Sequence, residues 1–304
     1  MIHPTEQRAG LRAGSFAILL AGLLCAGRAR AYCLASTCDA DGAVCEPPQI
    51  TDCGMPLRWH RSCVGFAVQR DASVQVPRAT AQNVVRQAFD AWEQASCEGG
   101  APGIHVEDMQ SVECDRVEYN QTAANANVIV FRDEAWTHPD DPHNIALTTV
   151  TFDTKTGEIV DADIEVNTAQ YKLTTTDTTA DYDLLAVLTH EAGHFLGLAH
   201  SAQPEATMFA SYSREAGTLD PDDAQAICRV YPPAAISACN PIPRHGFSTS
   251  CAGAQTEGDC SAAPLKPTPG GAAAIAALAL GAALKRIRRS RRKGRRSRAR
   301  RQSC

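Results

Sequence analysis

The sequence lacks several features that would point to other classes of protein. No two of its 13 cysteines have the CxxC spacing of a cysteine-bound zinc site, so a zinc ion bound in that way is not expected. The N-terminal apolar run, residues 15–26, is shorter than the roughly 18–20 residues that a membrane-spanning helix needs. Residues 285–304 contain twelve Lys and Arg but no acid. The two ends of the chain therefore differ in kind from the rest.

The N-terminal residues have the pattern of a secretory signal peptide. Arg8 and Arg12 precede the apolar run, and the small-residue sequence Ala-Arg-Ala follows it at 29–31. This pattern predicts cleavage after Ala31 and export of the mature chain, with a membrane anchor as the less favoured alternative. Export leads to an oxidising compartment, where disulfides form and persist.

Ten cysteines lie between the signal peptide and Cys260. They are Cys33, Cys38, Cys45, Cys53, Cys63, Cys97, Cys114, Cys228, Cys239 and Cys251. Their even number predicts up to five disulfides, whose connectivity the sequence leaves open. Cys97 and Cys114 lie on either side of a predicted strand at residues 104–109. A disulfide between them could attach the end of the predicted helix at residues 80–95 to the sheet.

A metal-binding pattern occupies residues 190–201, which read HEAGHFLGLAHS. Helix positions four apart lie on one face, so His190 and His194 can offer two imidazole nitrogens to one metal ion. Glu191 lies about 100° round the helix from His190, where it can act as a general base on bound water. Gly197 can take the left-handed conformation that ends a helix, which lets His200 approach as a third ligand. Three protein ligands and one open position predict a catalytic zinc site.

The full pattern HExxHxxGxxH, followed by Ser201, resembles that of the matrixins, the branch of the metzincin zinc proteases that includes the matrix metalloproteinases. The resemblance implies an α+β fold with a twisted, mostly parallel five-stranded sheet and an antiparallel edge strand. It also implies two long helices and a small C-terminal subdomain with a third helix. Met208 is expected to form the methionine turn beneath the three histidines. In such enzymes the last strand borders the active-site cleft and can pair with an extended substrate.

Hydrophobic periodicity predicts the elements of this domain in order. The predicted strands are residues 64–69, 104–109, 128–132, 146–153 and 158–167. The predicted helices are residues 80–95 with Thr80 as N-cap, a metal-binding helix that begins near Asp181, and a closing helix capped by Asp220. In the last strand Asp161, Asp163 and Glu165 alternate with apolar residues, which predicts an exposed acidic face.

Two features of the family are incomplete in this sequence. Some matrixins bind a structural zinc and calcium ions near the loop that here carries His138, Asp140 and His143. The further histidines of that pattern are missing, so a solvated loop is favoured and Ca²⁺ is a secondary prediction beside one catalytic Zn²⁺. The stretch Cys-Gly-Met-Pro at 53–56 superficially resembles the cysteine switch of matrixin propeptides. A structural disulfide at Cys53 is the favoured interpretation.

The C-terminus combines Cys260, an apolar segment at 270–284 and the basic tail at 285–304. These parts resemble the tripartite sorting signal of myxobacterial surface proteins, in which processing machinery removes the tail and the cysteine retains the protein at the cell surface. A basic tail can also indicate nucleic-acid binding. The chain has a net charge of −5, to which the tail contributes +12 and residues 1–31 contribute +3, so residues 32–284 carry −20. This acidic body argues against nucleic acid as a partner.

The predicted organisation is a signal peptide (1–31), a cysteine-rich arm (32–58), a catalytic domain (59–233), a linker with cysteine and proline (234–269) and a sorting segment (270–304). The predicted function is a monomeric zinc endopeptidase that acts on protein or peptide substrates outside the cell or at its surface. The alternative is a surface adhesion or binding protein that uses the same scaffold without catalysis. Such a protein is expected to lose the base or a ligand, and all four residues are present.

Overall fold

The structure of the chain is a computed structural model. It describes residues 32–38, 54–176, 181–236 and 238–251 with their side chains, and residues 297–303 as backbone. The expected signal peptide, Cys53, Cys260 and the apolar segment at 270–284 lie outside the described residues. Within the described part of the chain, no helix is both long and apolar enough to cross a membrane.

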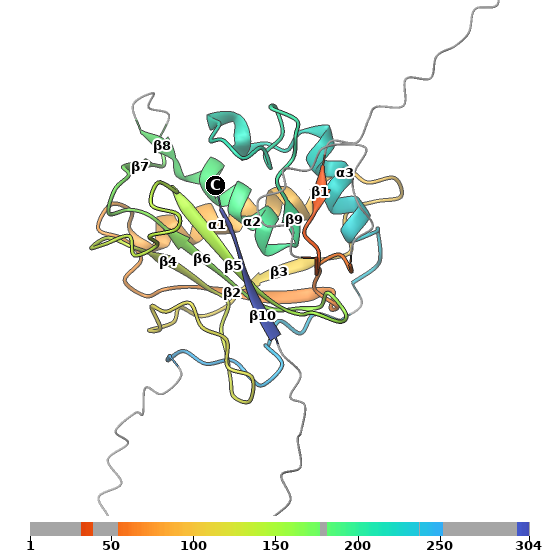
Figure 1. Ribbon diagram of the computed structural model, residues 1–304, viewed down its shortest axis with the longest axis horizontal. Coiled ribbons are helices and arrows are strands. Elements are labelled where there is room, and N and C mark those ends of the chain that lie inside the picture. Colours follow the sequence, from red (N-terminus) through yellow and green to blue (C-terminus); the bar gives the residue numbers. More distant parts are fainter. Residues whose placement is uncertain (1–31, 39–53, 177–180, 237, 252–296, 304) are drawn as a thin grey trace, which may run out of the picture.

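A mixed sheet forms the centre of the fold (Figure 1). Its strands include β2 (Cys63–Val68), β3 (His105–Asp108), β4 (Val128–Phe131), β5 (Ala146–Asp153) and β6 (Ile159–Val166). They lie in the order β3-β2-β4-β6-β5, with β5 antiparallel to β6 and the other pairs parallel. This confirms the expected α+β fold with a mostly parallel sheet and an antiparallel edge strand. The structure adds one strand, β10 (Ser297–Ser303), on the outer edge of β5.

Three α-helices accompany this sheet in the described part of the chain (Figure 1). They are α1 (Arg78–Glu93), α2 (Leu184–Phe195) and α3 (Pro221–Val230), with a short 3₁₀ helix, η1 (Arg214–Gly217), before α3. Trp92 of α1 donates from Nε1 to the carbonyl of Thr189 in α2 at 2.8 Å. Thr80 is not the N-cap of α1, because the helix already begins after Pro77, which has no N–H to satisfy. The third helix begins as predicted, with Asp220 as N-cap.

Two small sheets flank the central one. β1 (Cys33–Leu34) pairs antiparallel with β9 (Leu198–Ala199), and β7 (Leu173–Thr174) pairs parallel with β8 (Tyr182–Asp183). β1 belongs to the cysteine-rich arm, and β9 leads directly to His200. The backbone N–H of Ala35 also donates to the carbonyl of Gly197 at 3.0 Å. The arm therefore supports the stretch of chain that carries the third histidine.

The acidic face of β6 is buried, so the prediction of an exposed face is wrong. Asp161, Asp163 and Glu165 are only 2%, 1% and 3% exposed. Irregular chain contributes to their cover: the carboxylate of Asp163 accepts a hydrogen bond from the backbone N–H of Glu118 at 3.2 Å, and a second one from Val128 at the start of β4 at 2.7 Å. A period-two pattern identifies two faces of a strand but not whether loops cover the polar one.

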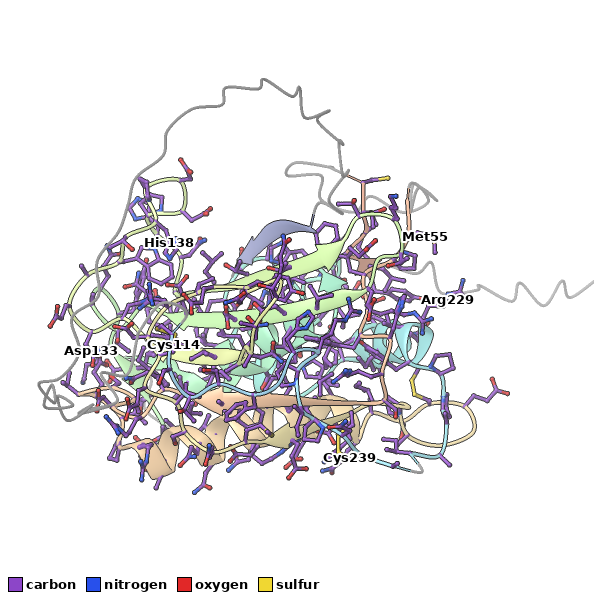
Figure 2. All side chains as sticks on the ribbon, turned by 90° about the horizontal axis from the view of Figure 1, so that it is seen from below. Met55, Cys114, Asp133, His138, Arg229 and Cys239 are labelled. Atoms are coloured by element: carbon purple, nitrogen blue, oxygen red, sulfur yellow. A yellow bond between two sulfur atoms is a disulfide. The ribbon has the colours of Figure 1, made fainter. Side chains whose placement is uncertain are left out.

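Long-range disulfides fix the segments that lie over the sheet. Cys63 pairs with Cys239, Cys97 with Cys228 and Cys114 with Cys251, and Cys33 and Cys38 are also disulfide-bonded. Cys114 and Cys239 mark two of these attachments (Figure 2). The suggestion that Cys97 and Cys114 together clip a helix end to the sheet is wrong, because each pairs with a cysteine more than 130 residues away. The residues after α3 are thereby tied back onto the sheet.

The buried carboxyls of β6 make stability depend on pH. Burial raises the pKa of Asp163 to about 8, and burial together with the Asp163 charge raises the pKa of Asp161. A carboxyl with a raised folded-state pKa contributes stability that is complete below the unfolded pKa of about 3.9 and is lost as the pH rises through the folded pKa. We therefore expect Asp161→Asn to raise the free energy of unfolding at pH 8 by roughly 1–3 kcal/mol. Urea denaturation between pH 5 and pH 8 measures this difference.

The matched control is Asp140→Asn. It makes the same change from carboxylate to amide, but at an exposed aspartate outside the buried pair. It should leave the pH dependence of unfolding as in the unmodified protein. Asp161→Asn should flatten that dependence, since its amide can donate to Asp163 without a titrating proton. Equal slopes for the unmodified protein and Asp161→Asn would contradict the expectation.

Candidate metal centre

Helix α2 carries two of the three predicted ligands. It begins at Leu184 rather than near Asp181, because the side chain of Asp183 caps it by accepting a hydrogen bond from the N–H of Ala186 at 2.9 Å. His190 and His194 are 2% and 1% exposed. Their Nε2 atoms lie 3.1 Å apart, so the four-residue spacing does place both rings on one face.

The third histidine arrives by the turn that the sequence predicts. Gly197 follows α2 with a φ of +93°, the left-handed region that favours glycine. β9 then brings His200 to the other two, with its Nε2 atom 3.2 Å from that of His194. The ligand atoms of all three histidines lie within 4.8 Å of one another.

Backbone carbonyls orient the two histidines of α2. His190 donates from Nδ1 to the carbonyl of Thr207 at 2.6 Å, and His194 donates from Nδ1 to the carbonyl of Leu198 at 2.9 Å. With the proton on Nδ1, each Nε2 lone pair points toward the common centre. Burial, with a smaller effect from His200, lowers the pKa of His190 to about 3. The ring is therefore neutral, the form that binds a metal.

The three imidazoles fit a tetrahedral zinc ion. Zinc–nitrogen bonds of about 2.0–2.1 Å at tetrahedral angles place the ligand nitrogens roughly 3.3–3.4 Å apart. Two of the Nε2 pairs, His190–His194 at 3.1 Å and His194–His200 at 3.2 Å, come near this spacing. Neutral nitrogens whose lone pairs face one another repel, and a cation between them removes that repulsion. Three histidines are also the ligand set of a catalytic rather than a closed structural site.

Glu191 lies beside the histidines and is fully buried. Its Oε2 accepts a hydrogen bond from the hydroxyl of Thr148 on β5. This bond connects the predicted general base to the edge strand of the sheet. The sequence did not single out Thr148, because it lies in an ordinary strand pattern and only the packing of β5 against α2 brings it to Glu191.

Met208 lies against α2, the helix that carries His190 and His194, as the family pattern predicts. It is 1% exposed, and its sulfur approaches α2 at Gly193, between the two histidines of the helix. A Cβ at Gly193 would overlap the Met208 sulfur and lie 2.8 Å from Cζ2 of Trp92. The glycine therefore allows a close approach that a larger residue would block.

Two aspartates in the first turn of α3 hold the segments around the histidines. Asp223 accepts hydrogen bonds from the backbone N–H groups of Thr207 at 2.7 Å and Met208 at 3.0 Å. Burial raises the pKa of Asp223 to about 6, although these N–H groups favour its charged form. Asp222 accepts from the hydroxyl of Ser201 at 2.7 Å. Helical spacing places both acids in the first turn of α3, but it does not show their contacts with a distant segment.

The loop that carries His138, which is labelled in Figure 2, is less exposed than predicted. His138 is 6% exposed, its Nε2 lies 2.9 Å from a carboxylate oxygen of Glu165, and its ring lies 4.5 Å from that of Trp136. The prediction of a solvated loop is therefore wrong for His138, whereas Asp140 and His143 are exposed. Among the described residues, no cluster of three potential ligand atoms includes any of them. Calcium binding stays a prediction.

Comparison with known proteins points to one family. The family model described as matrixin matches residues 58–232. Neutrophil collagenase of Homo sapiens is 30% identical over 196 residues, which cover 63% of this chain and 36% of that protein. Interstitial collagenase B of Mus musculus is 45% identical over 60 residues, covering 19% and 13%. Probable matrix metalloproteinase 095L of Invertebrate iridescent virus 3 is 39% identical over 61 residues, covering 19% and 17%. The matches thus span little more than a third of these relatives, or less.

Proposed function

The chain belongs to the matrixin family of metalloproteases, and from this premise we propose that it is a zinc-dependent endopeptidase that hydrolyses protein or peptide substrates. The observation that carries the proposal is the convergence of three histidine Nε2 atoms within 4.8 Å of one another, next to the buried carboxylate of Glu191. His190, His194 and His200 would hold the ion. One open position would remain for water.

The chain's own residues would contribute positioning and proton transfer. When bound, zinc supplies the Lewis acidity that lowers the pKa of water and polarises the scissile carbonyl. Glu191 takes the proton from the attacking water at its carboxylate and passes it to the leaving amine. Thr148 holds this carboxylate in place through its hydroxyl. The carbonyls of Thr207 and Leu198 keep the proton of each bonded histidine on Nδ1.

We further propose that the protein acts outside the cell or at its surface, as a monomer, after removal of residues 1–31. One contact supports this cleavage site. The backbone nitrogen of Tyr32 lies 3.1 Å from a carboxylate oxygen of Asp222. Cleavage after Ala31 would turn this nitrogen into a charged α-amino group beside the carboxylate, which strengthens the bond. Asp222 also binds Ser201, directly after the third histidine.

The C-terminal part of the proposal rests on the sequence alone. Processing machinery would remove the apolar and basic segments, and Cys260 would retain the protein at the surface. Mass spectrometry of the protein recovered from intact cells would identify both mature ends. Recovery of the unprocessed chain from the cytoplasm alone would contradict this localisation.

The enzymatic proposal is tested with purified residues 32–269 and casein, an unstructured protein substrate. We expect cleavage that a zinc chelator abolishes and that added Zn²⁺ restores. Metal analysis should find about one zinc per chain. A protein that binds zinc with this stoichiometry but cleaves neither casein nor a peptide library would support the alternative of a non-catalytic binding protein.

A further inference from the structure

The edge of β5 is occupied by a segment of the same chain. β10 pairs antiparallel with β5 from Ser297 opposite Asp153 to Ser303 opposite Leu147, a continuous register of seven residue pairs. Figure 1 shows β10 beside β5 along the length of the strand. Apart from β10, β5 ends the sheet on this side. Its outward backbone N–H and C=O groups would otherwise be available to another strand.

This edge lies next to the candidate metal centre. Thr148 of β5 donates to the carboxylate of Glu191, and its register partner in β10 is Gln302. The backbone of β10 therefore runs one strand away from the residue that contacts the proposed base. An extended substrate that pairs with β5 near Glu191 needs the same backbone groups. β10 and such a substrate cannot occupy the edge together.

We propose that residues 297–303 are a ligand of the β5 edge in cis, so that the unprocessed chain blocks its own substrate-binding edge until the tail is removed. The blocking role rests on the proposed proteolytic function, whereas the docking itself does not.

The charges of the two parts favour this docking. Residues 297–303 form an extended basic segment with three arginines and no acid. Residues 32–284 carry a net charge of −20, which remains when the +12 of the tail and the +3 of residues 1–31 are subtracted from the −5 of the whole chain. This charge difference favours association of the tail with the body.

The covalent connection makes weak pairing sufficient. Residues 252–296 join β10 to the last described residue of the domain. A tethered segment experiences an effective concentration on the order of 1 mM, so a strand with an affinity of only ~0.1 mM would be docked about 90% of the time. A separate substrate at micromolar concentration would then compete poorly for the edge. Removal of the tail would abolish this advantage.

The test uses the full chain, with intact mass confirming that the tail is present. In the variant Arg300→Pro/Arg301→Pro, at least one proline falls where β10 donates a ladder hydrogen bond, since these positions alternate along a strand. Arg300→Lys/Arg301→Lys is the matched control, because it keeps both the charge and the backbone N–H groups. Hydrogen exchange of the β5 amides and the rate of peptide cleavage are measured on all three proteins.

We expect the proline variant to lose exchange protection at those amides of residues 147–153 that face β10, while the amides that face β6 stay protected. It should cleave a fluorogenic peptide about tenfold faster, matching the ~90% occupancy above. The lysine control should behave as the unmodified chain. Unchanged exchange in the proline variant would overturn the docking. Protection that rises with protein concentration would overturn the cis arrangement in favour of a second copy. Lost protection with an unchanged rate would overturn the block.

The two proposals fail in different ways. If no form of the protein cleaves peptides but the exchange result holds, the proteolytic function and the block fail while docking of the tail stands. If all forms cleave equally and β5 is never protected by the tail, the docking fails and the proteolytic function stands. Hydrogen exchange thus provides a readout that does not depend on activity.

Discussion

Glu191→Ala is expected to slow casein cleavage by about 10²–10⁴-fold while one zinc stays bound. The side chain is fully buried and lies beside the three histidines, but it is not one of the converging nitrogen ligands. Its removal therefore takes away the proton acceptor and leaves the ligand set unchanged. The decrease should appear mainly in kcat, because proton transfer matters in the transition state more than in substrate binding. Steady-state kinetics with a defined peptide, together with metal analysis, measure both parts.

Two further variants sharpen this experiment. Glu191→Gln keeps the shape of the side chain and an acceptor for the Thr148 hydroxyl but cannot take a proton, so it should be nearly as slow as Glu191→Ala. Glu205→Ala removes an exposed carboxylate shortly after the third histidine and should leave kcat unchanged. Glu191→Gln with normal activity would reject the general-base assignment. Loss of zinc from Glu191→Ala would instead indicate that the residue supports the metal site.

The parts of the fold that the sequence predicted are those with a strong local pattern. β5 was predicted with its observed bounds, because residues 147–152 are a continuous run made mostly of β-branched and aromatic residues. The helix of the metal site was expected from its histidine spacing and apolar face, and Gly197 from the need for a left-handed turn. Each of these features depends on residues that are close together in the sequence.

The features that the sequence missed depend on contacts between distant segments. Asp161 and Asp163 are buried because irregular chain, held by disulfides such as Cys114–Cys251, covers one face of the sheet. Irregular segments have no periodicity from which such a cover can be predicted. The same reason applies to Asp223, which accepts hydrogen bonds from the backbone of Thr207 and Met208. It also applies to Thr148 in the sheet, which donates a hydrogen bond to Glu191 in α2.

The candidate site is thus supported by two kinds of residue. The histidines and Glu191 are recognised by type and spacing, because metal ligation and proton transfer require particular side chains. Thr148, Asp222 and Asp223 act through hydrogen bonds that other polar residues could also make, so their types alone do not identify them. Structure adds these supporting residues by showing which atoms they contact.

Gly197→Ala is expected to destabilise the protein by about 2–5 kcal/mol, the sum of left-handed strain and overpacking. The residue has a φ of +93°. A Cβ there would overlap the carbonyl oxygen of Leu57, lie 3.0 Å from its carbonyl carbon and lie 3.3 Å from Cδ1 of Ile159. Because these neighbours are backbone and core, the added methyl group must displace the turn itself. Urea unfolding of the metal-free protein measures the change in free energy.

The turn at Gly197 also determines where His200 lies, so the same substitution should weaken zinc binding. Gly197 accepts the N–H of Ala35 from the arm, and the next residue, Leu198, accepts the Nδ1 proton of His194. Displacement of this stretch moves one ligand and disturbs the orientation of another, which typically costs 10–100-fold in metal affinity. Gly217→Ala is the matched control, since its Cβ would lie 3.5 and 3.6 Å from Leu185 side-chain atoms and 3.9 Å from the backbone nitrogen of Ala186, which are all ordinary contacts. If Gly197→Ala bound zinc as tightly as Gly217→Ala, the turn would not be what positions His200, and the arm that pairs with β9 would have to do so alone.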